Sequence, residues 1–421
     1  MAEQKIKSEI LQNGVRIVYE KLSHVRTVAI GIWVQSGARH EPEELCGISH
    51  FIEHMVFKGT NKRSARDIAE QMDGIGGQIN AFTSNECTCF YARSLDTHFD
   101  LAADVLCDIF FDSKFADADI RSERNVIYEE IGMYEDSPED LAVDRLNEAV
   151  FRGSSLGRPI LGTKKTLRTF NGQILKNYRD THYTSEGIIV SVAGNYSEEQ
   201  LNALKERFSK LPRSQSIYTP EAKYNRAVTL RRKPIEQNHL CIAFPMPGYS
   251  NDERFAIQLL SSILGGGMSS RLFQCVREEA GLCYSIASFT GTTAEQGLFC
   301  INTALSRETE SEAIDLIMDE IDSICQSGVE DLELFRAREQ LKANIMMGME
   351  NTNARMNNLA QNMLRYNRII TPDETMQRID AVTKEDILTC ARNVLDSKKM
   401  SFSGVGELKS ADWYKRRFNL L

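Results

Sequence analysis

The 421-residue sequence predicts an α+β fold with two structurally similar domains. Strand-like alternations of apolar residues occur twice at nearly the same offset, and a helical pattern follows each second strand. The length also exceeds what one small core needs and favours two or three domains. Each domain is therefore expected to be a mainly antiparallel sheet flanked by helices.

The strand patterns form two matched pairs. Residues 27–37 alternate apolar side chains on one face, as half-buried strands do, and residues 239–248 repeat the alternation. Residues 87–95 and 297–305 form the second pair. Both pairs are about 210 residues apart, close to half the chain. The repeat indicates two related domains, rather than one large one.

The predicted boundary lies in a polar stretch, residues 210–227, which has two prolines and no sustained periodicity. This places the first domain at residues 1–215 and the second at residues 216–421.

Composition excludes several classes of protein. A net charge of −9 without a basic stripe disfavours a nucleic-acid surface. No apolar run approaches the roughly 20 residues needed to cross a bilayer, and the polar N-terminus lacks a secretory core. Ten scattered cysteines then indicate reduced thiols in a cytoplasmic protein. Cys87 and Cys89 share one strand face, where core packing is expected.

Two of the seven histidines lie in the segment EELCGISHFIEHMVF, residues 43–57, which reads as a helix ending near Gly59. At about 100° per residue, His54 lies about 40° from His50, and Glu53 lies about 60° away on the other side. The three polar groups therefore share one face. The apolar residues cover the opposite face, namely Ile48, Phe51, Ile52, Met55 and Val56.

The pattern H-x-x-E-H can hold a metal ion. Zinc accepts imidazole nitrogen, and a catalytic site needs a third protein ligand and an open position for water. Glu53 is placed to act as the base that takes a proton from that water. Two alternatives remain at this point: a solvated polar helix face and a purely structural zinc site. The other five histidines, which show no paired spacing, are interpreted as structural or surface residues: His24, His40, His98, His182 and His239.

The third ligand is expected in residues 119–140, a helical pattern dense in carboxylates. Glu123 and Glu130 lie two turns apart on one face, whereas Glu129 points about 100° away and is expected in solvent. Apolar contacts are expected from Val126, Ile127 and Ile131. Periodicity alone does not decide which carboxylate would bind a metal.

Together these residues resemble the inverzincin zinc peptidases, the group that contains pitrilysin, insulin-degrading enzyme and the mitochondrial processing peptidase. The signature is H-x-x-E-H, followed about 76 residues later by a glutamate ligand. That spacing leads from His54 to Glu130, so the resemblance implies His50, His54 and Glu130 as Zn²⁺ ligands. It also implies that Glu123 supports the site.

Two further segments resemble the family. Residues 76–92 are similar to its strand beside the metal, where a peptide substrate adds as an extra strand, and Asn80 and Ala81 occupy the matching positions. Residues 269–286 resemble its C-terminal motif. There Arg277 and Tyr284 fit the pair that steadies the oxyanion. The second half has no H-x-x-E-H, so only the first domain is expected to carry metal.

The resemblance, which extends over essentially the whole chain, implies a zinc endopeptidase that cleaves peptides or unstructured segments. The two-domain length is similar to the short-subunit branch, in which two chains close around a chamber. A homodimer with sites shared between chains is therefore expected, and a heterodimer with a related chain remains open. The alternative is a non-catalytic peptide-binding or structural subunit of the same fold.

Overall fold

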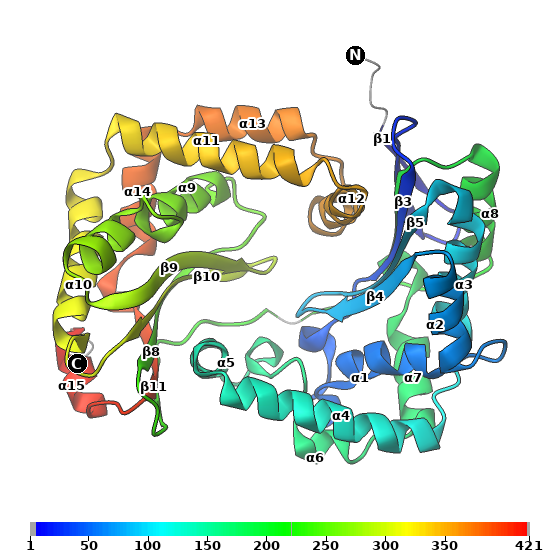
Figure 1. Ribbon diagram of the computed structural model, residues 1–421, viewed down its shortest axis with the longest axis horizontal. Helices are drawn as coiled ribbons and strands as arrows, with labels where there is room; N and C mark the ends of the chain where they lie inside the picture. The colour runs from blue at the N-terminus through cyan, green and yellow to red at the C-terminus, as the bar shows by residue number, and fades with distance from the viewer. Residues whose placement is uncertain (1–5, 220, 419–421) are drawn as a thin grey trace. The chain divides into compact units, whose positions relative to one another are not determined.

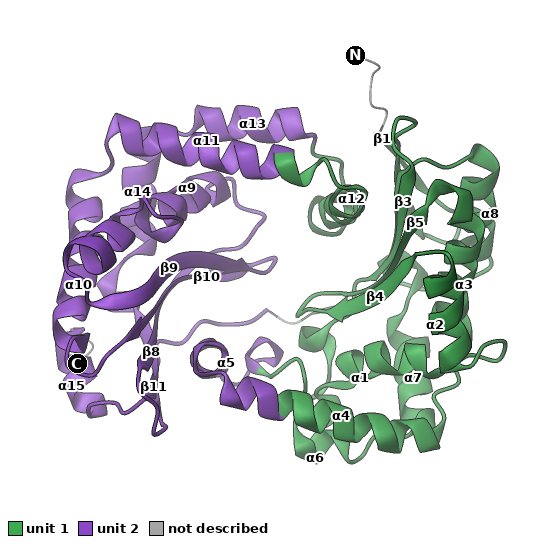
Figure 2. Ribbon diagram, viewed as in Figure 1, with its two compact units in different colours: residues 1–131, 158–220, 347–370 green, residues 132–157, 221–346, 371–421 purple. Residues whose placement is uncertain are grey.

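The computed structural model describes residues 6–219 and 221–418. The chain forms two compact units, each built around one mixed sheet (Figure 1). Unit 1 contains residues 1–131, 158–220 and 347–370, and unit 2 contains residues 132–157, 221–346 and 371–421 (Figure 2). Each unit thus includes one helical segment from the other half of the chain. These units group residues that lie close together in space, so they do not test where the sequence repeat begins and ends. The division into residues 1–215 and 216–421 therefore stays a prediction.

The sheet of unit 1 has the strand order β1-β2-β6-β3-β5-β4. Only β2 and β6 pair in parallel among these strands, and the other neighbours are antiparallel. Strand β4 lies at one edge and pairs only with β5 within the described residues. The strands are β1 (Ile6–Ile10), β2 (Arg16–Lys21), β3 (Thr27–Val34), β4 (Gln78–Thr83), β5 (Thr88–Leu95) and β6 (Ile188–Gly194).

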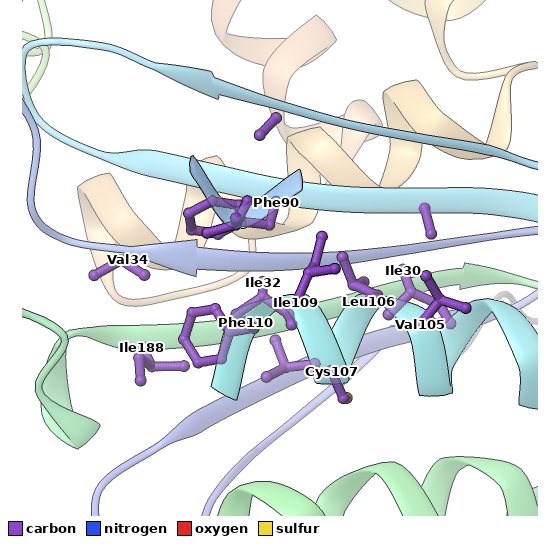
Figure 3. Packing of buried hydrophobic residues seen from close by; sticks show 14 of the residues in the cluster. Ile30, Ile32, Val34, Phe90, Val105, Leu106, Cys107, Ile109, Phe110 and Ile188 are labelled. Atoms are coloured by element: carbon purple, nitrogen blue, oxygen red, sulfur yellow. The ribbon is translucent and has the colours of Figure 1, made fainter. Parts of the chain in front are cut away.

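Helices cover both faces of this sheet. The larger core lies on one face, where Ile30, Ile32 and Phe90 pack against side chains such as Leu106 and Phe110 (Figure 3). On the opposite face, α12 (Thr352–Tyr366) packs on β2, β3 and β6. The other helices are α1 (Ile48–Met55), α2 (Ala65–Gly74), α3 (Phe99–Asp112), α4 (Asp117–Asp136), α6 (Lys164–Leu167), α7 (Gly172–His182) and α8 (Glu198–Ser209).

The sheet of unit 2 has the order β7-β11-β8-β10-β9. Its strands are β7 (Val228–Arg232), β8 (Asn238–Pro247), β9 (Cys283–Thr292), β10 (Gln296–Leu305) and β11 (Ser401–Gly406). Helix α5 (Pro138–Val150) packs on one face of this sheet. The remaining helices of the unit are α9 (Arg254–Gly265), α10 (Glu310–Ser327), α11 (Asp331–Gly348), α13 (Pro372–Ala381), α14 (Lys384–Val394) and α15 (Ala411–Arg417).

The two sheets confirm the repeat predicted from the sequence. Taking β2, β3, β4, β5 and β6 as counterparts of β7, β8, β9, β10 and β11, the strand order is the same in both units. Each unit has one parallel pair, β2 with β6 and β11 with β7. The fold is therefore α+β with two similar sheet-and-helix domains, as expected.

The expectation of half-buried strands was wrong for β3. Every residue of β3 after Thr27 is buried, because α12 covers the face that the core helices leave open. Cys87 and Cys89 lie in this second core, which confirms their packing role. All ten cysteines fall within the described ranges and are free thiols. In those ranges no helix combines the length and apolar character needed to cross a membrane.

Candidate metal centre

Helix α1 begins at Ile48, not in the segment from residue 43 where the sequence predicted its start. Gly47 precedes it with φ +93°, and a Cβ there would lie 2.6 Å from the Cα of Gly162. Only glycine tolerates this backbone at such close approach. The buried carboxylate of Glu41 accepts hydrogen bonds from the N–H groups of Gly47 (2.7 Å) and Ser49 (2.8 Å). The start of α1 is therefore set by a glycine turn and a carboxylate cap.

The predicted two faces of α1 are confirmed. Its apolar side lies in the unit 1 core through Ile48, Phe51, Ile52 and Met55. The opposite side carries His50, Glu53 and His54. After α1, a short helical turn ends at Gly59, whose φ of +117° and ψ of 155° lie in a backbone region that glycine adopts readily.

Helix α4 supplies the carboxylates. It ends at Asp136, and Pro138 opens the next helix, because proline fits the first turn of a helix but not its interior. The predicted helix through residue 140 was thus too long. Ile127 is buried and Glu129 is exposed, as expected. Val126 is 48% exposed, so its predicted apolar contact was wrong.

His50, His54 and Glu130 converge on one point. The Nε2 atoms of His50 and His54 lie 3.6 and 3.5 Å from Oε2 of Glu130. In a tetrahedral zinc site with bonds of about 2.1 Å, neighbouring ligand atoms are about 3.4 Å apart. Donor types and spacing therefore fit a zinc ion. Across the described ranges, this is the one group of three such side chains that could hold a metal.

Glu123 and Lys58 support His54 from the side away from Glu130. The Nδ1 of His54 lies 2.9 Å from Oε1 of Glu123, and Nζ of Lys58 lies 2.5 Å from the other carboxylate oxygen. When His54 is neutral, a hydrogen bond donated by Nδ1–H leaves the Nε2 lone pair free for a cation. The buried Nδ1 of His50 has no hydrogen-bond partner among the described residues.

Burial and hydrogen bonds set the protonation of the two histidines in the site. Burial lowers the pKa of His50 to about 4, which keeps its imidazole neutral. Burial also lowers the pKa of His54, but hydrogen bonds to Glu123 and Glu130 outweigh it and raise the pKa to about 9. A hydrogen bond from His54 holds the pKa of Glu130 below its usual value. Without a metal, His54 is therefore an imidazolium between two ionised carboxylates, and a bound cation would replace its Nε2 proton.

Glu53 points toward the edge strand β4. Its Oε2 accepts a hydrogen bond of 2.6 Å from the hydroxyl of Thr83. Burial raises the pKa of Glu53. The same strand carries Asn80 and Ala81, and Asn80 Oδ1 accepts the N–H of Ala81 at 2.8 Å.

Arg277 and Tyr284 lie together in unit 2. Arg277 belongs to a π-helical segment, Phe273–Glu279, and Tyr284 follows on β9. The guanidinium carbon of Arg277 lies 5.4 Å from the centre of the Tyr284 ring. Tyr284 is 77% exposed and the side chain of Arg277 is 35% exposed, so both groups are accessible at the surface of this unit.

Sequence reasoning missed three residues that the structure connects to the site: Glu41, Lys58 and Thr83. Lys58 lies four residues beyond His54, a spacing that could have indicated a shared face. Thr83 and Glu41 act through tertiary or turn contacts, and no periodicity in the sequence indicates them.

Several known proteins similar to this chain are named as zinc proteases. A profile of the family described as Insulinase (Peptidase family M16) matches residues 16–164, and one described as Peptidase M16 inactive domain matches residues 169–341. The uncharacterized zinc protease YmxG of Bacillus subtilis is 41% identical over 92% of this chain and 95% of its own length. An uncharacterized zinc protease of Rickettsia felis is 36% identical over 92% of this chain and 94% of its own length.

Solved structures show the same fold. A protease from Helicobacter pylori superposes with a TM-score of 0.88 at 18% identity, covering 96% of this chain and 99% of that one. A chain of complex III from Candida albicans gives 0.84 at 17% identity, covering 98% and 100%. Because relatives above 30% identity match nearly the whole length, the chain belongs to the insulinase family, peptidase family M16.

Proposed function

We propose that this protein is a zinc-dependent endopeptidase that cleaves peptides or unstructured protein segments. The observation that carries the proposal is the convergence of His50, His54 and Glu130 at ligand-to-ligand distances of 3.5 and 3.6 Å. Two imidazoles and one carboxylate leave a fourth tetrahedral position open, as catalytic zinc sites require. Structural zinc sites usually have four protein ligands, which disfavours a purely structural role.

In this proposal the metal site and Glu53 have separate roles in peptide-bond hydrolysis. A bound zinc ion would polarise the scissile carbonyl and lower the pKa of the attacking water. Glu53 accepts a proton from that water as its oxygen bonds to the carbonyl carbon. The same carboxylic acid returns the proton to the amine nitrogen as the carbon–nitrogen bond breaks.

Substrate binding is assigned to strand β4. Its outer edge has no partner strand among the described residues, so an extended peptide can add there through backbone hydrogen bonds. Asn80 and Ala81 are the proposed contacts. The N–H of Ala81 donates to Oδ1 of Asn80, so a peptide that adds at this edge must replace Asn80 as the acceptor of that hydrogen bond.

Arg277 and Tyr284 are proposed to stabilise the oxyanion. A guanidinium and a phenol are donors suited to developing negative charge. The family resemblance supports this role and a homodimer in which the pair acts on the metal site of the partner chain. A cytoplasmic location is part of the same proposal, supported by ten free thiols.

The proposal is tested with Glu53→Gln. The variant should bind zinc as the wild type does, because Glu53 is not a ligand, but cleave an unstructured peptide library roughly 100- to 10,000-fold more slowly. Zinc content is measured by atomic emission and cleavage by mass spectrometry, with and without chelator. Near-normal turnover by the folded variant, or wild-type cleavage that chelator does not abolish, would contradict the mechanism.

The alternative is a non-catalytic subunit of the same fold. A chain of complex III has this fold, which makes the alternative worth testing. Wild-type protein that holds zinc but cleaves no peptide of the library would favour it.

A further inference from the structure

One contact joins the edge strand to the face of α1 that carries the metal-binding histidines. The hydroxyl of Thr83, the last residue of β4, donates a 2.6 Å hydrogen bond to Oε2 of Glu53. The two residues are 30 positions apart, so the bond depends on the packing of β4 beside α1. Within residues 6–219 and 221–418, the Glu53 carboxylate accepts no other hydrogen bond.

The pleat of β4 explains why Thr83 faces α1. Side chains alternate along a strand, so Ile79, Ala81 and Thr83 share one face. Ala81 and Ile79 pack in the core that also contains the apolar side of α1. Phe82 points to the other face, where its ring meets Trp33 edge-on at 5.3 Å. The direction of the Thr83 hydroxyl is therefore set by packing on both faces of the strand.

The bond also restricts the chemistry of Glu53. A carboxylate on a three-torsion side chain can rotate, and a hydrogen bond to one oxygen limits that rotation. Because the hydroxyl occupies Oε2, the other oxygen remains available to take a proton. Thr83 is β-branched and stiff at χ1, so it provides a fixed donor.

We infer that Thr83 is a positioning residue that holds the Glu53 carboxylate in the orientation needed for proton transfer. The inference rests on the proposed endopeptidase function, in which Glu53 is the base. Thr83 also lies on the strand proposed to receive substrate, two residues after Ala81. Strand β4 would thus contact both the added peptide and, through Thr83, the carboxylate of Glu53. This shared contact fixes the position of Glu53 relative to the peptide.

Removal of the Thr83 hydroxyl should lower kcat and leave KM nearly unchanged. Thr83→Val keeps the shape of the side chain but removes the donor, so kcat should fall about 10- to 100-fold, as misplaced catalytic groups do. KM and zinc content should change less than about twofold, since the backbone of β4 and the ligands remain. Thr83→Ser restores the hydroxyl and should keep kcat within about threefold of the wild type.

Thr88 provides a matched control. It lies opposite Thr83 in the β4–β5 register, and its buried hydroxyl donates to the carbonyl of Ser36 instead. Thr88→Val should lower the melting temperature without the selective loss of kcat. If Thr88→Val and Thr83→Val reduce kcat equally, the effect is structural and the inference is wrong.

Two further outcomes separate the inference from the proposed function. A wild type without chelator-sensitive cleavage overturns the endopeptidase proposal, whereas an active wild type with unchanged kcat in Thr83→Val overturns only the role of Thr83. Crystal structures of the wild type, Thr83→Val and Thr83→Ser give a readout without turnover. The Glu53 carboxylate should hold one orientation in the wild type and Thr83→Ser and several in Thr83→Val, and one unchanged orientation in all three contradicts the inference.

Discussion

At the scale of single residues, the candidate metal centre is arranged by side chains outside the group of His50, His54 and Glu130. Glu123 fixes the ring of His54 through a 2.9 Å hydrogen bond, and Lys58 holds the other oxygen of Glu123. Hydrogen bonds from His54 and Lys58 outweigh burial and hold the pKa of Glu123 below its usual value, and Glu123 in turn directs Nε2 of His54 toward Glu130. Glu123 and Lys58 thus orient His54, a candidate ligand.

Glu123→Gln should weaken zinc binding. The amide cannot accept the Nδ1–H as strongly as a carboxylate, so the zinc dissociation constant should rise roughly 10- to 100-fold. The affinity is measured by competition with a chromophoric chelator. Glu129→Gln, on the same helix but exposed, is the matched control and should bind zinc like the wild type. Equal affinities in the two variants would contradict the role of Glu123.

His40 should make folding sensitive to acid. Burial, followed by the charge of Arg39, lowers its pKa to about 4, and the Gly37 N–H donates to its Nδ1 at 3.1 Å. The unfolded side chain titrates near 6.5, so the unfolded state takes up the proton first. Stability from neutral His40 is therefore complete above about pH 6.5 and is lost as the pH falls toward about 4.

The measurement is urea unfolding of wild type and His40→Gln between pH 4 and pH 8. The free energy of unfolding of the wild type should fall more steeply with acid, by up to about 1.4 kcal/mol per pH unit within this window. Parallel pH profiles for the two proteins would show that His40 is not responsible.

At the scale of elements, one face of each sheet is covered by a helix from the other half of the chain: α12 in unit 1 and α5 in unit 2. In unit 1, α12 covers the face of β3 that carries Trp33. The approach is close, because a Cβ on Gly31 would lie 2.3 Å from Sδ of Met356. Glycine at position 31 therefore allows the helix to rest on the strand.

Met356→Ala should test this packing. The side chain is fully buried, so its removal should lower the free energy of unfolding by roughly 2–5 kcal/mol. Met347→Ala, at a position that is 62% exposed, should change it by less than about 0.5 kcal/mol. Chemical denaturation of both variants is the measurement. A Met356→Ala loss as small as that of the control would mean that α12 contributes little to the stability of unit 1.

At the scale of the whole molecule, the proposed active site depends on how two chains combine. The proposed homodimer should have a molecular mass, measured by sedimentation equilibrium, of about twice the 47.6 kDa of one chain. A monomer at micromolar concentration that still cleaves peptide would contradict the shared-site proposal.

Complementation gives a sharper test of that proposal. Glu53→Gln and Arg277→Ala should each be nearly inactive alone. Coexpressed, they should recover about a quarter of wild-type activity, because half of randomly formed dimers are mixed and each carries one complete site. No recovery from mixed dimers would show that Glu53 and Arg277 act within one chain.

Local periodicity was sufficient for much of the architecture. The phase of α1, with His50, Glu53 and His54 opposite an apolar face, follows from 3.6 residues per turn. The alternation in β3 and β8 likewise revealed two related sheets, because strand side chains repeat every second residue.

Other features depend on contacts between distant segments. Periodicity left Glu123 and Glu130 equivalent, and family resemblance selected Glu130. The structure distinguishes them because the packing of α4 beside α1 brings Glu130 near both Nε2 atoms and Glu123 near Nδ1 of His54. The cover of α12 on β3 and the bond from Thr83 to Glu53 also join residues far apart in sequence. Such contacts are set by the register between packed elements, which no local pattern of residues contains.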